Sequence, residues 1–174
     1  MFKKPNIHMI IREASNEDWD SIWTFFKQIV EAGDTYAYDP KISKPNAKRI
    51  WFESPQKTYV CISDGIVQGS YFIKPNYLGP GSHVCNCGYM VSSGARGKGL
   101  ATKMCEHSQR VALEFGYKAM QYNIVAANNT AALHLWKKHG FIEVGRVPEG
   151  FKHPDDGYVD ALVMHKWLAP RSSH

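Results

Sequence analysis

The sequence has no long hydrophobic run. No apolar stretch in its 174 residues approaches the roughly 20 residues that a transmembrane helix needs. The basic amino terminus leads into an apolar stretch that His8 and Arg12 interrupt, which is not the pattern of a secretory signal peptide. We therefore expect no membrane partner and a cytoplasmic location.

The sequence also has little that could bind a metal ion. Its four cysteines include no C-x-x-C pair, and Cys85 and Cys87 would point to the same face of a strand. His134 and His139 are five residues apart, whereas the H-E-x-x-H pattern needs four. We expect no metal, and reduced thiols that serve as small core residues.

No long run of one charge occurs, although the net charge is +5 at pH 7. The nearest approaches to basic clusters, at 41–49 and 137–138, are typical of solvated helix faces. The positive balance is compatible with a polyanionic cofactor, an acidic surface or nucleic acid, and does not distinguish them. We expect no nucleic-acid partner.

What is present is a mixture of helical and strand patterns in a chain of ordinary globular composition, 44% hydrophobic and 21% charged. Without repeats or an obvious linker, we predict a single domain over 1–174, with a core at about 8–168 and a flexible tail at 169–174. Apolar spacing and turn residues predict strands at 8–14, 58–63, 66–74, 82–92, 118–126, 141–149 and 158–168, and helices at 15–33, 44–54, 98–115 and 129–140. Gly88 inside the strand 82–92 indicates a β-bulge.

The stretch SSGARGKGLATKM, residues 92–104, joins a predicted strand to a predicted helix, and such glycine-rich connections often bind phosphate. A Walker loop would require Lys and Ser or Thr after Gly99, where Leu100 and Ala101 stand. A dinucleotide-binding loop would require Gly or Ala in place of Thr102 and a position in the first βαβ unit. The loop fits neither class of nucleotide site.

The remaining pattern, Arg96-x-x-Gly99-x-Ala101, resembles the acyl-CoA signature of the GNAT superfamily of N-acetyltransferases. NTAALHLWKKHGF, residues 129–141, is similar to a later motif of that superfamily, and the resemblance spans roughly 8–168. Residues 73–91 resemble the branch that contains the fungal acetyltransferase of azetidine-2-carboxylate and its bacterial relatives, and residues 31–40 resemble the substrate-side loop of phosphinothricin acetyltransferases. The resemblance implies an α/β fold with a mixed, mostly antiparallel twisted sheet, a splayed strand pair and flanking helices.

The resemblance also implies acetyl-CoA as co-substrate, lying between strands 82–92 and 118–126. Backbone N–H groups of residues 97–102 at a helix start could wrap its pyrophosphate. Backbone groups near Met90 would bind the pantetheine and polarise the thioester carbonyl. The predicted cofactor-binding residues are Met90, Val91, Arg96, Gly97, Lys98, Gly99, Leu100, Ala101, Thr102 and Asn129.

The catalytic residues are less obvious, because residues 82–91 contain no Asp or Glu where many relatives carry a glutamate. The azetidine branch implies that Asn86 and Asn123 lie at the acceptor site. His83 has a suitable intrinsic pKa for a base, although a lone strand histidine is more often structural. Trp136 stands where many relatives carry a proton-donating tyrosine; indole cannot protonate sulfur, so we predict that Trp136 packs.

For the acceptor, Glu31, Tyr36 and Tyr38 from the loop after the first helix, and Tyr158 near the last turn, are the predicted binding residues. The expected function is transfer of an acetyl group to the amine of a small molecule or amino acid by direct attack in a ternary complex. A non-catalytic acyl-CoA-binding regulatory module and a protein lysine acetyltransferase remain as alternatives, and a homodimer is left open.

Overall fold

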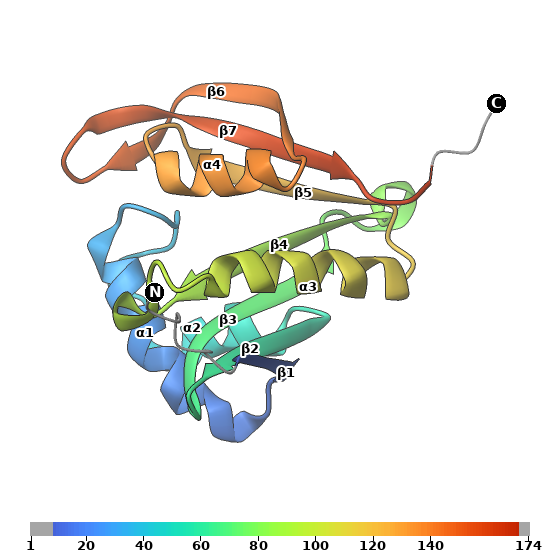
Figure 1. Ribbon diagram of the computed structural model, residues 1–174. Helices are drawn as coiled ribbons and strands as arrows, with labels where there is room; N and C mark the ends of the chain where they lie inside the picture. The colour runs from blue at the N-terminus through green and yellow to red at the C-terminus, as the bar shows by residue number, and fades with distance from the viewer. Residues whose placement is uncertain (1–8, 171–174) are drawn as a thin grey trace, which may run out of the picture.

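One seven-stranded sheet runs through the computed structural model, which describes residues 9–170 (Figure 1). Its order is β1-β2-β3-β4-β5-β7-β6. The elements are β1 (Met9–Glu13), α1 (Trp19–Ala32), α2 (Lys44–Lys48), β2 (Lys57–Ser63), β3 (Ile66–Pro75), β4 (Val84–Val91), α3 (Leu100–Glu114), β5 (Ala119–Ala126), α4 (Thr130–Lys138), β6 (Ile142–His153) and β7 (Gly157–Trp167). Residue 8 of the predicted first strand and residues 171–174 of the predicted tail lie outside the described residues.

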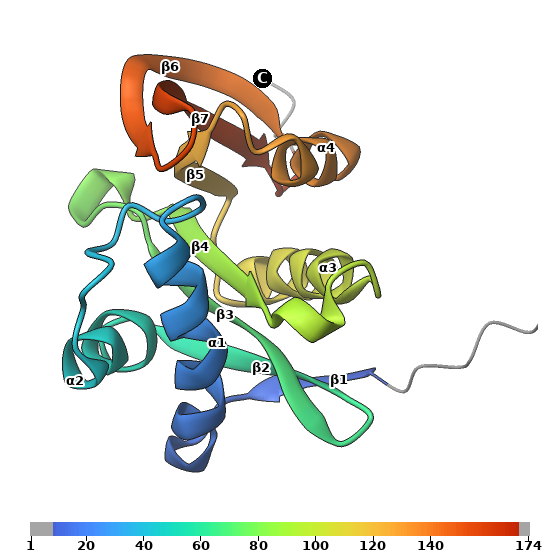
Figure 2. The same cartoon turned by 90° about the vertical axis from the view of Figure 1, so that its left-hand side faces the viewer.

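Strands β4 and β5 form the parallel pair of this sheet, and they stay together for only two register pairs. Val84 faces Ala119 and Cys85 faces Met120, and beyond these residues the strands diverge (Figures 1 and 2). The neighbouring pairs on both sides are antiparallel. The expected mostly antiparallel sheet with a splayed strand pair is confirmed.

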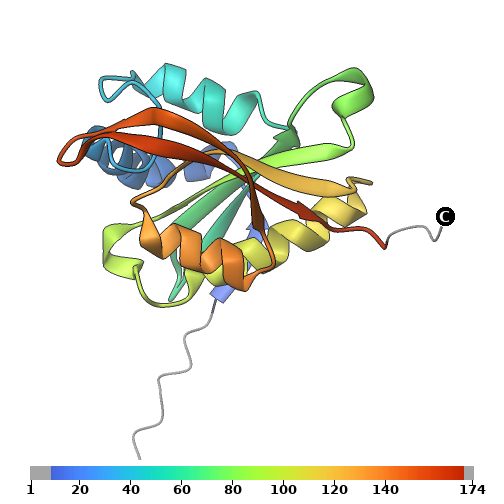
Figure 3. The same ribbon diagram turned by 90° about the horizontal axis from the view of Figure 1, so that it is seen from above.

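Helices cover both faces of the sheet on one side of the splay. Helices α1 and α2 lie on one face of β1–β4, and α3 lies on the other (Figures 2 and 3). Helix α4 covers β5–β7 on the same side as α3. The buried side chains divide accordingly into a cluster under α1 and α2 and a larger cluster under α3 and α4. The larger cluster holds all four cysteines as buried free thiols, as predicted.

A capping interaction precedes α1. The backbone N–H of Ser15 donates to the Asp18 carboxylate at 2.7 Å, and a short 3₁₀ turn places the start of the helix at Trp19 rather than at the predicted residue 15. The Arg12 guanidinium donates to both Asp18 oxygens at 2.8 Å and lowers the pKa of Asp18 to about 2. Gly33 ends the helix with φ +70°, a conformation that glycine adopts readily. The chain then turns toward β4.

The predicted β-bulge at Gly88 is wrong. The β3–β4 register continues through the pair Phe72–Gly88 without a shift. A Cβ atom at residue 88 would lie 2.6 Å from Phe72 Cε1, so the glycine is required for close packing. The irregularity near the splay is instead on β5, where the register shifts between Tyr122 and Val125.

Several element boundaries differ from the expected ones. The helix after the glycine loop begins at Leu100, because Gly97 and Gly99 take positive φ values of 76° and 87° that place them outside it. The helical stretch at 44–54 is α2 followed by a π-helical segment, Arg49–Glu53. Strand β6 continues to His153, four residues beyond the predicted end. Among residues 9–170, no helix is long and apolar enough to cross a membrane.

Candidate active site

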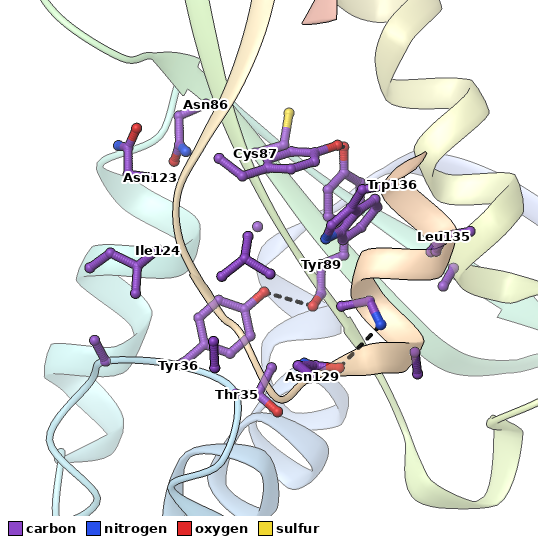
Figure 4. Close-up of a pocket in the computed structure, with 18 of the residues that line it drawn as sticks. Thr35, Tyr36, Asn86, Cys87, Tyr89, Asn123, Ile124, Asn129, Leu135 and Trp136 are labelled. Carbon is purple, nitrogen blue, oxygen red and sulfur yellow. Dashed lines mark hydrogen bonds between the residues drawn. The ribbon is translucent and has the colours of Figure 1, made fainter. Parts of the chain in front are cut away.

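A cavity of about 440 Å³ occupies the space where β4 and β5 separate (Figure 4). Its walls come from both strands, from the segment 35–38 after α1, and from the first turns of α4. Among the described residues, its lining contains amides, hydroxyls, a thiol and apolar groups but no charged side chain. A ligand in this cavity therefore meets hydrogen-bonding groups and aromatic surface rather than formal charge.

The open edge of β4 presents unpaired backbone groups to this cavity. Val84 O accepts from Asn76 N–H at 2.8 Å, and Ser92 N–H donates to Gln68 O at 2.8 Å, so the even-numbered residues turn their backbone groups toward β3. The odd-numbered residues, including Tyr89 and Val91, consequently face the splay. The backbone N–H groups near Met90 that face the splay are those of Tyr89 and Val91, because Met90 pairs with β3 and its side chain is buried.

Tyr36 joins the segment after α1 to β4. Its hydroxyl donates to Tyr89 O at 2.6 Å (Figure 4), and its ring stacks on Tyr38 with centroids 5.3 Å apart. Burial raises the pKa of Tyr36 well above its ordinary value and that of Tyr38 to about 12. Both predicted substrate-binding tyrosines therefore line the cavity as neutral phenols.

Asn86 and Asn123 lie at the same end of the cavity, as Figure 4 shows. Asn86 Nδ2 donates to Gln121 O at 2.9 Å and so bridges the two diverging strands. The Gln121 side chain donates to Asn123 Oδ1 at 3.0 Å, and Asn123 Nδ2 donates to Asn76 Oδ1 at 2.7 Å. The structure thus brings the two predicted asparagines into one amide cluster. Sequence reasoning missed its other members, Gln121 and Asn76, because nothing in their spacing marks them as site residues.

The start of α3 provides free hydrogen-bond donors. The backbone N–H of Lys103 donates to Gly99 O at 3.1 Å, so the N–H groups of Leu100, Ala101 and Thr102 precede the first intrahelical bond. Ala101 lines the main cavity, and Arg96 lines an adjoining one of about 410 Å³. These donors fit the diphosphate of a long ligand whose other end enters the splay.

Asn129 connects the two cavities. Its Oδ1 accepts from Ala132 N–H at 3.1 Å and caps α4, and the residue lines both cavities. The capping role and the predicted cofactor contact are therefore compatible. Asp34 and His153 also line the adjoining cavity. Asp34 belongs to the loop 31–40 that the sequence assigns to the acceptor, whereas His153 carries no motif.

Among the predicted catalytic and acceptor-binding residues, three lie away from both cavities. His83 is exposed, and its Nδ1 lies 3.1 Å from Pro80 O. Glu31 is exposed and forms an ion pair with Lys27 at 3.6 Å. Tyr158 is 65% exposed on the β6–β7 hairpin. The structure does not bring these three side chains to the splay.

Trp136 packs in the cavity wall, as predicted. It is 9% exposed, and its ring centroid lies 4.6 Å from that of Tyr122 and 5.2 Å from that of Tyr89. The two tyrosine hydroxyls are 3.1 Å apart, and that of Tyr89 lies 2.7 Å from Ser108 Oγ. Burial raises the pKa of both tyrosines well above the ordinary value. Sequence reasoning missed this hydroxyl chain, which is visible only once β4, β5 and α3 are assembled.

Comparison with known proteins places this site in a family. The sequence profile of the acetyltransferase (GNAT) family matches residues 16–141. N-acetyltransferase aca1 of Schizosaccharomyces pombe is 30% identical over 156 residues, which cover 80% of this chain and 75% of the relative. A GCN5-related N-acetyltransferase from Kribbella flavida is 42% identical with a TM-score of 0.88, covering 92% of this chain and 98% of that one.

The fold is also shared with yncA from Salmonella typhimurium, whose structure contains its cofactor acetyl-CoA. The TM-score is 0.83 at 21% identity, and the match covers 96% of this chain and 98% of yncA. The family profile covers well over half of this chain, and the splay and the donor-rich start of α3 suit a long acyl carrier. The chain therefore belongs to the GNAT family and is an N-acetyltransferase that depends on acetyl-CoA.

Proposed function

We propose that the enzyme acetylates the amine of a small molecule or amino acid by direct attack in a ternary complex. The observation that carries this proposal is the cavity at the splay, which has no charged side chain in its lining and is lined on one side by Tyr36 and Tyr38. A cavity of this size accommodates the acyl end of a thioester and a compact acceptor. The resemblance to the azetidine branch supports an amino-acid acceptor.

In this proposal the start of α3 holds the diphosphate of acetyl-CoA. The N–H groups of Leu100, Ala101 and Thr102 are available there, and Arg96 adds positive charge in the adjoining cavity. The N–H of Tyr89 and the backbone groups of Val91 bind the arm that enters the splay, because Tyr89 O already accepts from the Tyr36 hydroxyl. Acetyl-CoA supplies the activated acetyl group, and a β4 amide polarises its carbonyl.

Asn86 orients the acceptor amine. Because Asn86 Nδ2 is already bonded to Gln121 O, its Oδ1 is the atom that can accept a hydrogen bond from an amine N–H. An amide is not a proton acceptor of useful basicity, so the amine attacks in its neutral form and loses its proton afterward to water or to the departing thiolate. An unassisted thiolate leaving group costs only about 2 kcal/mol at neutral pH, so the absence of a proton donor at Trp136 is tolerable.

A turnover assay on small acceptors tests this function. Purified enzyme is incubated with acetyl-CoA and a panel of amines and amino acids, and acetylated products are detected by mass spectrometry. We expect turnover with at least one acceptor, and Asn86→Ala to lower kcat by about tenfold to a hundredfold while acetyl-CoA affinity is kept. Asn46→Ala, an exposed asparagine on α2, is the matched control and should keep full activity.

The alternatives give different results in the same assay. Tight binding of acetyl-CoA without turnover on any acceptor would favour a non-catalytic regulatory module. Acetylation of lysine in added protein, with no small amine modified, would favour a protein lysine acetyltransferase. The cytoplasmic location, the single domain over 1–174 and the homodimer option stay predictions from the sequence.

A further inference from the structure

Lys74 places a positive charge beside the uncharged cavity. It lies on β3 as the register partner of Asn86, so the two residues share one face of the sheet. Its Nζ lies 5.4 Å from the ring centroid of Phe72, and Phe72 forms part of the cavity wall. Within residues 9–170, Lys74 forms no hydrogen bond or ion pair through its side chain. Lys74 is exposed and does not itself line the cavity, so its charge is available to a ligand that extends from the cavity past Phe72.

The amide cluster at the same end of the cavity contains one unused buried donor. Asn76 Nδ2 is buried and has no hydrogen-bond partner among the described residues, because Asn76 binds Asn123 through Oδ1. Asn76 follows Lys74 by two residues. In the part of the chain that the structure describes, no Asp or Glu lines this cavity. An unused donor and a nearby cation favour a ligand that carries a negatively charged acceptor, of which a carboxylate is the common small example.

We propose that Lys74 binds a carboxylate of the acceptor, which makes the acceptor a small amino acid rather than an amine without an anionic group. This inference rests on the proposed function and adds its specificity-determining residue. In an antiparallel pair of this kind the Cα atoms are roughly 4.5–5.5 Å apart, so a carboxylate at Lys74 and an amine at Asn86 need few intervening atoms. An amine that carries only positive charge would be repelled at the same position.

Paired acceptors test the proposal: glycine and glycinamide, alanine and alaninamide, and proline and prolinamide. The two members of each pair differ in that the carboxylate of the acid is replaced by an uncharged amide. Because this replacement also lowers the pKa of the amine, kcat/KM is calculated from the concentration of neutral amine, so that the two members can be compared. We expect the wild-type enzyme to prefer the acid by about tenfold or more in at least one pair. Lys74→Met keeps the aliphatic stem, and it should abolish this preference by lowering kcat/KM for the acid while that for the amide stays within about threefold.

Lys138→Met is the matched control, since Lys138 is exposed in the last turn of α4 and lines neither cavity. Both variants should keep the circular dichroism spectrum and acetyl-CoA affinity of the wild type. Equal use of acids and amides by the wild type, or an unchanged preference in Lys74→Met, would overturn the role of Lys74 and leave the proposed function standing. If no test compound is acetylated although acetyl-CoA binds, the proposed function fails and this inference fails with it.

Discussion

At the residue scale, the main cavity has no side chain among residues 9–170 that could act as a base near neutral pH. Its titratable groups are tyrosines and Cys87, and burial raises the pKa of Tyr36, Tyr38, Tyr89, Tyr122 and Cys87. These groups stay protonated at pH 6–9 because each raised pKa lies above that range. The fraction of neutral acceptor amine should then control the rate.

A cavity lined in this way predicts a simple pH dependence. We expect log(kcat/KM) to rise with pH at a slope of one and to level off at the amine pKa of the acceptor. The bend should move when an acceptor with a less basic amine is used. A bend at one fixed pH with every acceptor would instead reveal an ionising residue of the enzyme.

Trp136 gives a second prediction at this scale. Because its indole packs against Tyr122 and Phe141, Trp136→Phe should preserve most of the contact area and leave kcat within about tenfold of the wild-type value. Stopped-flow or steady-state release of CoA measures the effect. A loss of kcat beyond about a hundredfold would show that Trp136 does more than pack.

Single residues also show where sequence reasoning succeeds. Asn86 and Asn123 could be assigned to one site because a family resemblance supplied their shared role. Lys74 and Asn76 could not, because, although they lie in the stretch 73–91 that carries the resemblance, nothing in the sequence shows that their side chains lie near Asn86 and Asn123. The predictions for His83 and Tyr158 are not supported by the structure, for a related reason. The sequence specifies the chemistry of each side chain, but the direction in which the side chain points depends on contacts that only the folded chain defines.

At the element scale, Gly88 shows why a glycine in a strand is ambiguous. A glycine in a strand can mark a β-bulge or a place where a neighbouring side chain packs against the backbone, and the sequence pattern is the same for both. At Gly88 a neighbouring side chain packs against the backbone, because a Cβ atom would lie 2.6 Å from Phe72 Cε1 and 3.3 Å from Trp51 Cζ3. The bulged strand is β5, and no glycine marks that position. By contrast, the glycine loop was predictable because Gly97 and Gly99 adopt the positive φ angles that the backbone needs just before the helix.

Gly88→Ala tests this interpretation of β4. The added methyl group must displace the rings of Phe72 and Trp51, and overpacking of this kind costs about 1–3 kcal/mol of unfolding free energy. Urea denaturation measures the change. Gly94→Ala is the control, because a Cβ atom added there would meet nothing within 4 Å and its φ is not positive, so stability should change by less than about 0.5 kcal/mol. Equal stability of the two variants would contradict the close packing.

At the scale of the whole molecule, the splay divides the sheet into two parts that are joined where β4 and β5 meet. One part is β1–β4 with α1, α2 and α3, and the other is β5–β7 with α4. Since only two register pairs connect the strands, a ligand in the splay contacts both parts at once. The order of strands and helices was readable from the sequence, whereas the depth of the cleft depends on packing between distant elements.

Every step proposed above depends on acetyl-CoA binding along the β4 edge and at the start of α3, and hydrogen exchange with and without acetyl-CoA tests this placement. Backbone N–H groups that gain a partner should exchange more slowly. We predict protection of peptides covering 88–103 and 122–132, with β1 and β2, at 9–13 and 57–63, unchanged. Protection confined to β1 and β2, with β4 and α3 unaffected, would show that the cofactor binds elsewhere.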